Sequence, residues 1–97
     1  MGLESSFQPE VIAALEELFP KAVIFKTDPN TIQGFPDLII LQGKKWAALE
    51  TKRARKSSHR PNQDYYVDLL GKMSYAAFVN PANLEKVLRE VQNALRP

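Results

Sequence analysis

The sequence predicts one α/β domain whose elements follow the order α-β-β-β-α-β-α. Three observations support this prediction. Apolar residues recur at helical spacing in three segments, short β-branched and aromatic runs lie between them, and two of these runs flank a short turn that contains glycine. At 97 residues the chain is long enough to form a core of its own. No repeat or low-complexity segment divides it, so residues 1–97 are expected to form a single domain.

The first half of the chain should contain a helix, a strand and a hairpin. Ser5 or Ser6 can cap the helix, Pro9 is tolerated in its first turn, and Pro20 marks its end. The apolar residues Val11, Ile12, Leu15, Leu18 and Phe19 recur at the spacing that predicts this helix. A strand over 22–25 and a loop over 27–33 that is rich in turn formers should follow.

The hairpin is expected over 36–42 and 45–52, and it brings two acids together. A two-residue loop at Gly43-Lys44 fits a type II′ turn, and the numbers of paired residues then sum to 87. Asp37 therefore faces Glu50, although directly opposed like charges destabilise a sheet. Two carboxylates with Cβ atoms about 5 Å apart are better explained by a divalent cation between them. Lys52 should point to the same face as Glu50.

The second half should contain a helix, a strand and a last helix. Pro61 opens the first of these helices and Gly71 closes it. A strand over 74–79 follows. Asn80 is expected to cap the last helix, with Pro81 at its first position. The buried stripe of this helix is predicted to be Leu84, Val87, Leu88, Val91 and Leu95.

Positive charge is concentrated in one part of the chain. Residues 44–60 include seven Lys or Arg and one acid, a net charge of +6 in a chain whose total is +2. Such a patch indicates a site for a polyanion, and the simpler alternative is a solubilising loop over 53–60. The absence of cysteine excludes a disulfide framework and a thiolate zinc site. No apolar run approaches the length of a membrane span and no signal peptide is visible, so a cytoplasmic location is expected.

Trp46 and Phe78 are expected to lie in the core. For Tyr65 and Tyr66, core packing is favoured over stacking on an unpaired base. His59 lies in the polar basic loop, where an isolated histidine is most often exposed, so no catalytic role is assigned to it.

The motifs together resemble a known nuclease superfamily. Pro36-Asp37 followed by Glu50-Thr51-Lys52 resembles the signature of the PD-(D/E)XK nucleases. These have a restriction-endonuclease-like αβββαβ core with a mixed central sheet flanked by helices, to which this chain would add a C-terminal helix. Four strings resemble the VRR-NUC subgroup, which includes small stand-alone proteins, many from phages: Glu4-Ser-Ser-Phe7-Gln8, Gly34–Ile39, Ala48–Arg53 and Arg60–Gln63.

The resemblance implies a site for Mg²⁺ or Mn²⁺. Asp37 and Glu50 would be carboxylate ligands, and the backbone carbonyl of Thr51 a third ligand. Hard oxygen ligands suit these ions, which assist phosphodiester hydrolysis. Lys52 would orient the attacking water and counter the developing negative charge. A protonated lysine cannot ligate a metal, so its role must be electrostatic or acid–base.

The resemblance also implies residues outside the hairpin. A glutamate near the start of the first helix would complete the site, and Glu4 matches it, with Glu10 as the alternative. Either could instead complement the helix dipole. Gln63 would face the active site and position water or phosphate, although a glutamine there can also bond its own helix cap. The candidate phosphate contacts are Arg53, Arg55, Lys56, Arg60 and Lys26.

We therefore expect a Mg²⁺-dependent endodeoxyribonuclease. The sequence contains no base-reading module, so its selectivity should depend on DNA structure, as in a Holliday junction resolvase that cuts branched DNA. Symmetric cutting of two strands needs two active sites, which favours a homodimer. The alternatives are a non-catalytic DNA-binding module and a nuclease subunit of a larger DNA-processing assembly.

Overall fold

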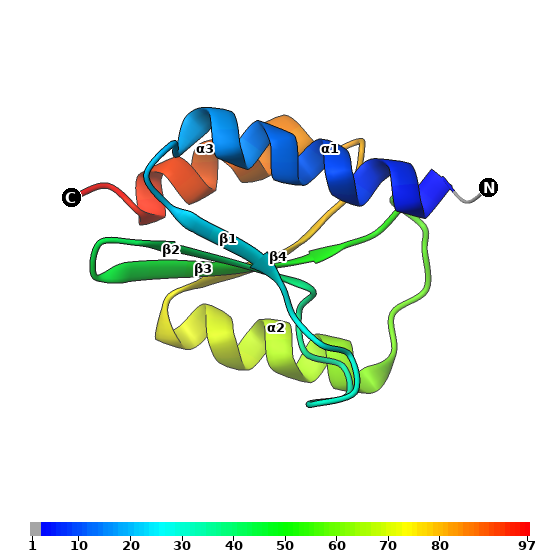
Figure 1. The fold of residues 1–97 in the computed structure, drawn as a ribbon. Helices are drawn as coiled ribbons and strands as arrows, with labels where there is room; N and C mark the ends of the chain where they lie inside the picture. Colours follow the sequence, from blue (N-terminus) through cyan, green and yellow to red (C-terminus); the bar gives the residue numbers. More distant parts are fainter. Residues whose placement is uncertain (1–2) are drawn as a thin grey trace.

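Seven elements follow one another in the predicted order (Figure 1). The structure is a computed structural model that describes residues 3–97, and it describes side chains from residue 7 onward. The elements are α1 (Leu3–Leu18), β1 (Val23–Lys26), β2 (Leu38–Gln42), β3 (Lys45–Thr51), α2 (Pro61–Met73), β4 (Tyr75–Val79) and α3 (Leu84–Ala94). Among the described residues, no helix is long and apolar enough to cross a membrane.

The four strands form one mixed sheet in the order β1-β2-β3-β4. The first three strands are antiparallel, and β4 lies parallel to β3 after the crossover through α2. The predicted hairpin register is confirmed, because Gln42 pairs with Lys45 and Leu38 with Leu49. Gly43 has a φ of +61° and Lys44 has no positive φ, as a type II′ turn requires.

Two helices cover one face of the sheet. Helices α1 and α3 pack side by side on this face, which we call the closed face (Figure 1). It holds the larger hydrophobic core, because alternate strand residues point toward the helices. The buried members of this core are Phe7, Val11, Leu15, Phe19, Leu38, Ile40, Ala47, Leu49, Val79, Val87, Val91 and Leu95.

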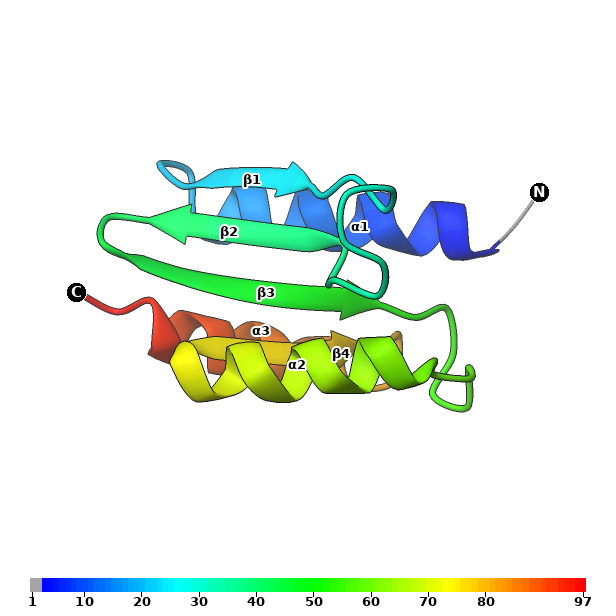
Figure 2. The same ribbon diagram turned by 90° about the horizontal axis from the view of Figure 1, so that it is seen from below.

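The other face is covered only in part. Helix α2 packs on β3 and β4, and the β1 side of the sheet lies beyond it (Figure 2). A smaller buried cluster of Ile39, Ala48 and Leu70 lies under α2. We call this side the open face, because Val23, Phe25 and Leu41 remain exposed on it.

The first helix differs from the prediction at its start. It begins at Leu3, before both candidate cap serines, and Pro9 lies in its interior rather than in its first turn. A proline there removes one backbone hydrogen bond. The buried stripe of Phe7, Val11 and Leu15 continues through this position, and its burial keeps the segment helical.

The ends of the other two helices also correct the prediction. Gly71 does not close α2, which continues to Met73. Asn80 does not cap α3 directly. Its side chain accepts the backbone N–H groups of Ala82 and Asn83, and this turn places the start of α3 at Leu84. The predicted stripe of α3 is confirmed, with Val87 and Val91 fully buried.

The aromatic residues are less buried than expected. Tyr65 is 60% exposed, so its expected place in the core is wrong. Phe78 is half-buried, and its ring stacks on His59 with 3.8 Å between the ring centroids. Trp46 packs against the small cluster under α2, as predicted for a core residue.

Candidate active site

Asp37 lies just before β2, and donors from two other elements hold its carboxylate. The backbone N–H of Thr51 donates to Oδ1 at 2.9 Å, and the Thr51 hydroxyl donates to Oδ2. The Nε2 of Gln8, on α1, donates to Oδ2 at 2.8 Å. These donors stabilise the charged carboxylate in a half-buried position and fix its direction.

Glu50 and Lys52 lie at the end of β3, and both are buried. The Lys52 Nζ is 3.9 Å from Glu50 Oε2 and donates to the carbonyl of Ser58 at 3.1 Å. Because an isolated buried charge is costly, each of these two groups needs the other. The expected position of Lys52 on the same face as Glu50 is confirmed.

Gln63, in the first turn of α2, links the two charges. Its Nε2 donates to Glu50 Oε2 at 3.0 Å, and its Oε1 accepts from Lys52 Nζ at 2.7 Å. The same oxygen accepts the backbone N–H of Arg60 at 3.1 Å, so Gln63 also caps its own helix. The bond to the helix cap is therefore confirmed, and the role of Gln63 in positioning water or phosphate stays a prediction.

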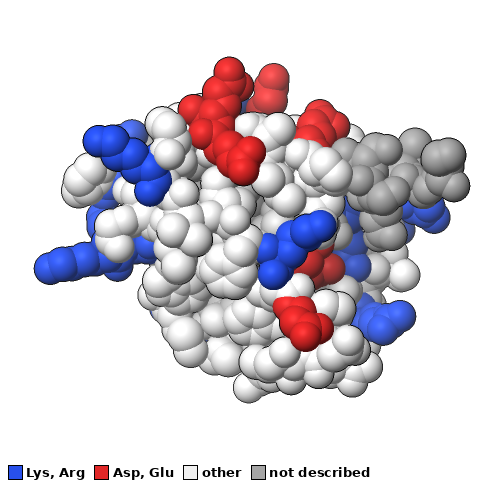
Figure 3. Space-filling model, in the orientation of Figure 1, with Lys and Arg blue, Asp and Glu red and all other residues white. Residues whose placement is uncertain are grey.

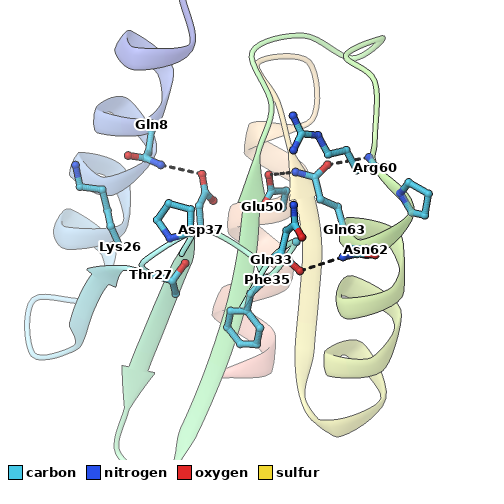
Figure 4. A pocket seen from close by; sticks show the side chains of 13 residues that line it. Gln8, Lys26, Thr27, Gln33, Phe35, Asp37, Glu50, Arg60, Asn62 and Gln63 are labelled. Atoms are coloured by element: carbon cyan, nitrogen blue, oxygen red, sulfur yellow. Dashed lines mark hydrogen bonds between the residues drawn. The ribbon is translucent and has the colours of Figure 1, made fainter. Parts of the chain in front are cut away.

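Asp37, Glu50, Gln63 and Gln8 face one cleft at the end of the sheet, and Lys52 lines the adjacent hollow. Figure 4 shows the side chains of Asp37, just before β2, and of Glu50, on β3, pointing into the same space, with Gln8 on the α1 side and Gln63 on the α2 side. The cleft has a volume of about 630 Å³. The two opposed carboxylates are tolerated because each has its own set of donors.

The cleft is also shaped by a close contact between the loop before β2 and α2. Gly34 has a φ of +87°, and a Cβ at this position would lie 2.3 Å from the Cβ of Asn62. Asn62 Nδ2 donates to the carbonyl of Gln33 at 3.4 Å. Only glycine fits this contact, which explains the glycine three residues before Asp37.

The predicted phosphate contacts divide into two groups. Lys26 and Arg60 line the cleft, and Arg53 lines an adjacent hollow of about 410 Å³ together with Lys52 and Arg60. Arg55 and Lys56 are exposed on the basic loop and line neither space.

The charge on the surface of α1 has the opposite sign. Figure 3 shows acidic side chains gathered along α1, which carries the exposed residues Glu10, Glu16 and Glu17. A polyanion is therefore expected to approach the cleft from the side of the basic residues rather than across α1.

The predicted glutamate that would complete the site with Asp37 and Glu50 is either Glu4 or Glu10. Glu10 is exposed and does not line the cleft, because it follows Gln8 by two positions and residues two apart on a helix do not share a face. The side chain of Glu4 lies outside the described residues. The role of the Thr51 carbonyl stays a prediction.

Sequence reasoning missed three contributors. Gln8 was part of a motif but had no assigned role. For Thr51 only the backbone carbonyl was considered, and not its N–H and hydroxyl donors. His59 had no assigned partner. The His59 ring stacks on Phe78 and its Nδ1 lies 3.0 Å from Asp64 Oδ1, so it ties the basic loop to α2. The partner of Gln8 lies 29 positions away and that of Thr51 lies 14 positions away, so no local pattern indicated them.

The donor set fits a hard divalent cation. The described residues include no group of three or more His, Cys, Asp or Glu placed to hold a metal. Mg²⁺ nevertheless binds in many proteins through one or two carboxylates, and water and substrate phosphate complete its coordination. Asp37 and Glu50 meet this requirement, since both present carboxylate oxygens to one cleft.

Comparisons with known proteins support the fold. No protein-family model matches the chain, and no curated protein matches it. Among solved structures it is similar to a protein described as "VRR_NUC domain protein", with a TM-score of 0.70 and 21% sequence identity, over 99% of this chain and 90% of that one. The chain therefore has the fold of a VRR_NUC domain protein, as its motifs predict.

Proposed function

We propose that the chain is a metal-dependent endonuclease that hydrolyses DNA phosphodiester bonds. The observation that carries this proposal is that Glu50 and Gln63 line both the cleft that contains Asp37 and the adjacent hollow that contains Lys52, with cations around both spaces. The likeness to a protein named for a nuclease domain supports it. A structural ion pair alone would need neither a cleft of this size nor basic residues around it.

Asp37, Glu50 and the Thr51 carbonyl would hold Mg²⁺ or Mn²⁺. When bound, the ion stabilises charge on the phosphate oxygens and activates a water. Thr51 and Gln8 keep the Asp37 carboxylate in a fixed direction, so little reorganisation is needed when the ion binds.

Lys52 would act on the attacking water and on the developing negative charge. Gln63 accepts from its ammonium group and donates to Glu50, so it bridges the two charged groups, whose Nζ and Oε2 atoms lie 3.9 Å apart. Lys52 lines the hollow next to the cleft. Lys26, Arg53 and Arg60 would contact the phosphate backbone without reading sequence.

The proposal predicts loss of cleavage in Asp37→Asn. We would measure strand cleavage of four-way junction, flap, single-stranded and linear duplex DNA with Mg²⁺, Mn²⁺ or EDTA. Activity should fall at least about a hundredfold in the variant, by analogy with metal ligands and their supports. Asp68→Asn is a matched control, since Asp68 is an exposed acid of α2 paired with Lys72. No cutting of any DNA by the wild type would instead favour the non-catalytic DNA-binding module.

The preferred substrate is proposed to be branched DNA, cut by a C2 homodimer. Two symmetric active sites are the natural means of cutting two strands of a junction. Sedimentation of the protein with junction DNA tests this arrangement, and a monomer on the junction would contradict it. Equal cutting of all four DNA forms would remove the preference for branched DNA. Constant copurification with a second protein would favour a subunit of a larger assembly.

A further inference from the structure

A second hollow adjoins the candidate active site on the open face. It has a volume of about 230 Å³ and lies between the end of β1 and the loop that follows it. Three residues, Lys26, Thr27 and Phe35, line both this hollow and the cleft that contains Asp37 and Glu50. The cleft and the hollow are therefore neighbours that share part of their lining.

Three apolar side chains, Phe25, Ile32 and Phe35, line the hollow beside the polar residues 26–28 and Thr31. Phe35 packs against the cluster under α2 and lies 5.6 Å from the Tyr66 ring, so its ring is anchored. Phe25 and Ile32 form the exposed walls, with 45% and 40% of their surface accessible. Two large apolar side chains facing solvent beside a polar cleft indicate a surface that binds a ligand.

The exposure of Phe25 follows from the sheet register. Phe25 pairs with Ile39, and Ile39 pairs with Ala48, so the three lie in one row on the open face. Helix α2 covers Ile39 and Ala48 through Leu70 but does not reach β1. The row therefore ends in an uncovered aromatic ring next to the cleft.

We infer that this hollow receives an unpaired nucleobase of the DNA strand whose phosphate lies in the cleft. This inference rests on the proposed nuclease function. A base has two flat faces that stack on aromatic side chains, and Phe25 and Phe35 supply such rings. Lys26 follows Phe25 in β1, and its side chain extends toward Gln8 on the α1 side of the cleft, where it complements the phosphate next to the bound base (Figure 4).

Both faces of a base in a duplex are covered by the stacked neighbouring bases, so a base can contact these rings only outside the duplex, where it is unpaired. The hollow should also tolerate any base. Two of the polar groups at its edge are used within the loop, because the Thr27 hydroxyl donates to the Pro36 carbonyl and Asp28 accepts the N–H of Asn30. Recognition through ring faces rather than base edges is tolerant of sequence. Substrates with an unpaired nucleotide next to the cut should then be favoured over linear duplex.

A double-mutant cycle tests this contact by binding, with EDTA present so that no strand is cut. One arm is Phe25→Ala, and the other replaces unpaired nucleotides of a flap, one at a time, by an abasic residue. The wild type should bind the intact flap about 5- to 10-fold more tightly than the flap that is abasic at one position. Phe25→Ala should bind both equally. Val23→Ala is the matched control, since Val23 is exposed on the same strand and face but does not line the hollow.

The other outcomes distinguish this inference from the proposed function. If the wild type cuts DNA but no abasic position weakens its binding, the inference is wrong and the nuclease proposal stands. An equal loss by Phe25→Ala on intact and abasic flaps would also overturn it. If that loss came with a change in oligomeric state, a second copy of the chain would occupy the hollow instead. Failure of the wild type to bind or cut any DNA would overturn both proposals.

Discussion

The closed and open faces of the sheet have similar strands but different coverings. On the closed face, α1 and α3 bury a continuous apolar core. On the open face, α2 covers only β3 and β4, and the site residues lie where this cover and the end of α1 meet the sheet. The difference indicates a division of roles, because a fully covered face stabilises the fold and a partly covered one leaves room for a ligand.

The division is not complete, since α1 belongs to the closed face and still supports the site. Its residue Gln8 donates to Asp37, while Gln63 of α2 donates to Glu50. The two carboxylates are thus held from opposite sides of the sheet. Variants on each face, measured for both unfolding free energy and DNA cleavage, test whether one face mainly stabilises the fold and the other mainly supports the site.

The largest expected effect is on the closed face. Leu15 is fully buried between α1 and the sheet, so Leu15→Ala should lower the free energy of unfolding by about 2–5 kcal/mol. Leu41→Ala, the same change on the open face, should cost less than about 1 kcal/mol, because Leu41 is exposed. Urea unfolding monitored by circular dichroism measures both. Equal losses would contradict the proposed difference between the faces.

A second comparison, between Glu4 and Glu10 of α1, tests which glutamate completes the site with Asp37 and Glu50. If Glu4 completes the metal site, Glu4→Gln should reduce cleavage by about a hundredfold and raise the Mg²⁺ concentration needed for half-maximal activity. Glu10→Gln is the matched control, since Glu10 does not line the cleft. Unchanged cleavage in Glu4→Gln, or a loss confined to Glu10→Gln, would exclude Glu4.

Gln63 both caps α2, through the Arg60 N–H, and contacts the site residues Glu50 and Lys52. Gln63→Ala should reduce the rate of cleavage about 10- to 100-fold, the range seen for groups that support metal ligands. It should also lower stability by about 1 kcal/mol through loss of the bond to the Arg60 N–H. Single-turnover rates and unfolding midpoints separate the two effects. A loss of stability with unchanged turnover would limit Gln63 to a structural role.

The smallest expected effect concerns Tyr75, which packs against the closed core. Burial, and then the hydrogen bond from its hydroxyl to Glu90, raise the pKa of Tyr75 well above its ordinary value. The folded state therefore keeps a proton that the unfolded state loses above about pH 10. Stability should fall as the pH rises above that value and should be independent of this group below it. In Tyr75→Phe, unfolding midpoints should decline less steeply above about pH 10 than in the wild type.

The local pattern of the sequence was enough to predict most of the fold. The order of elements, the buried stripe of α3 and the register of the hairpin follow from periodicity and turn geometry, which involve neighbouring residues. The errors at Pro9 and Gly71 occurred where packing outweighs local preference. In both cases the helix continues through a residue that would end it in isolation.

The sequence by itself determined the pair Asp37 and Glu50, because a two-residue turn sets which strand positions are opposite. Only the tertiary structure decided which donors hold these acids and which apolar residues stay exposed. Gln8 and Asp37 are 29 positions apart, and the exposure of Phe25 depends on how far α2 extends across the sheet. Contacts of this kind depend on how whole elements pack, and no local pattern of residues encodes them.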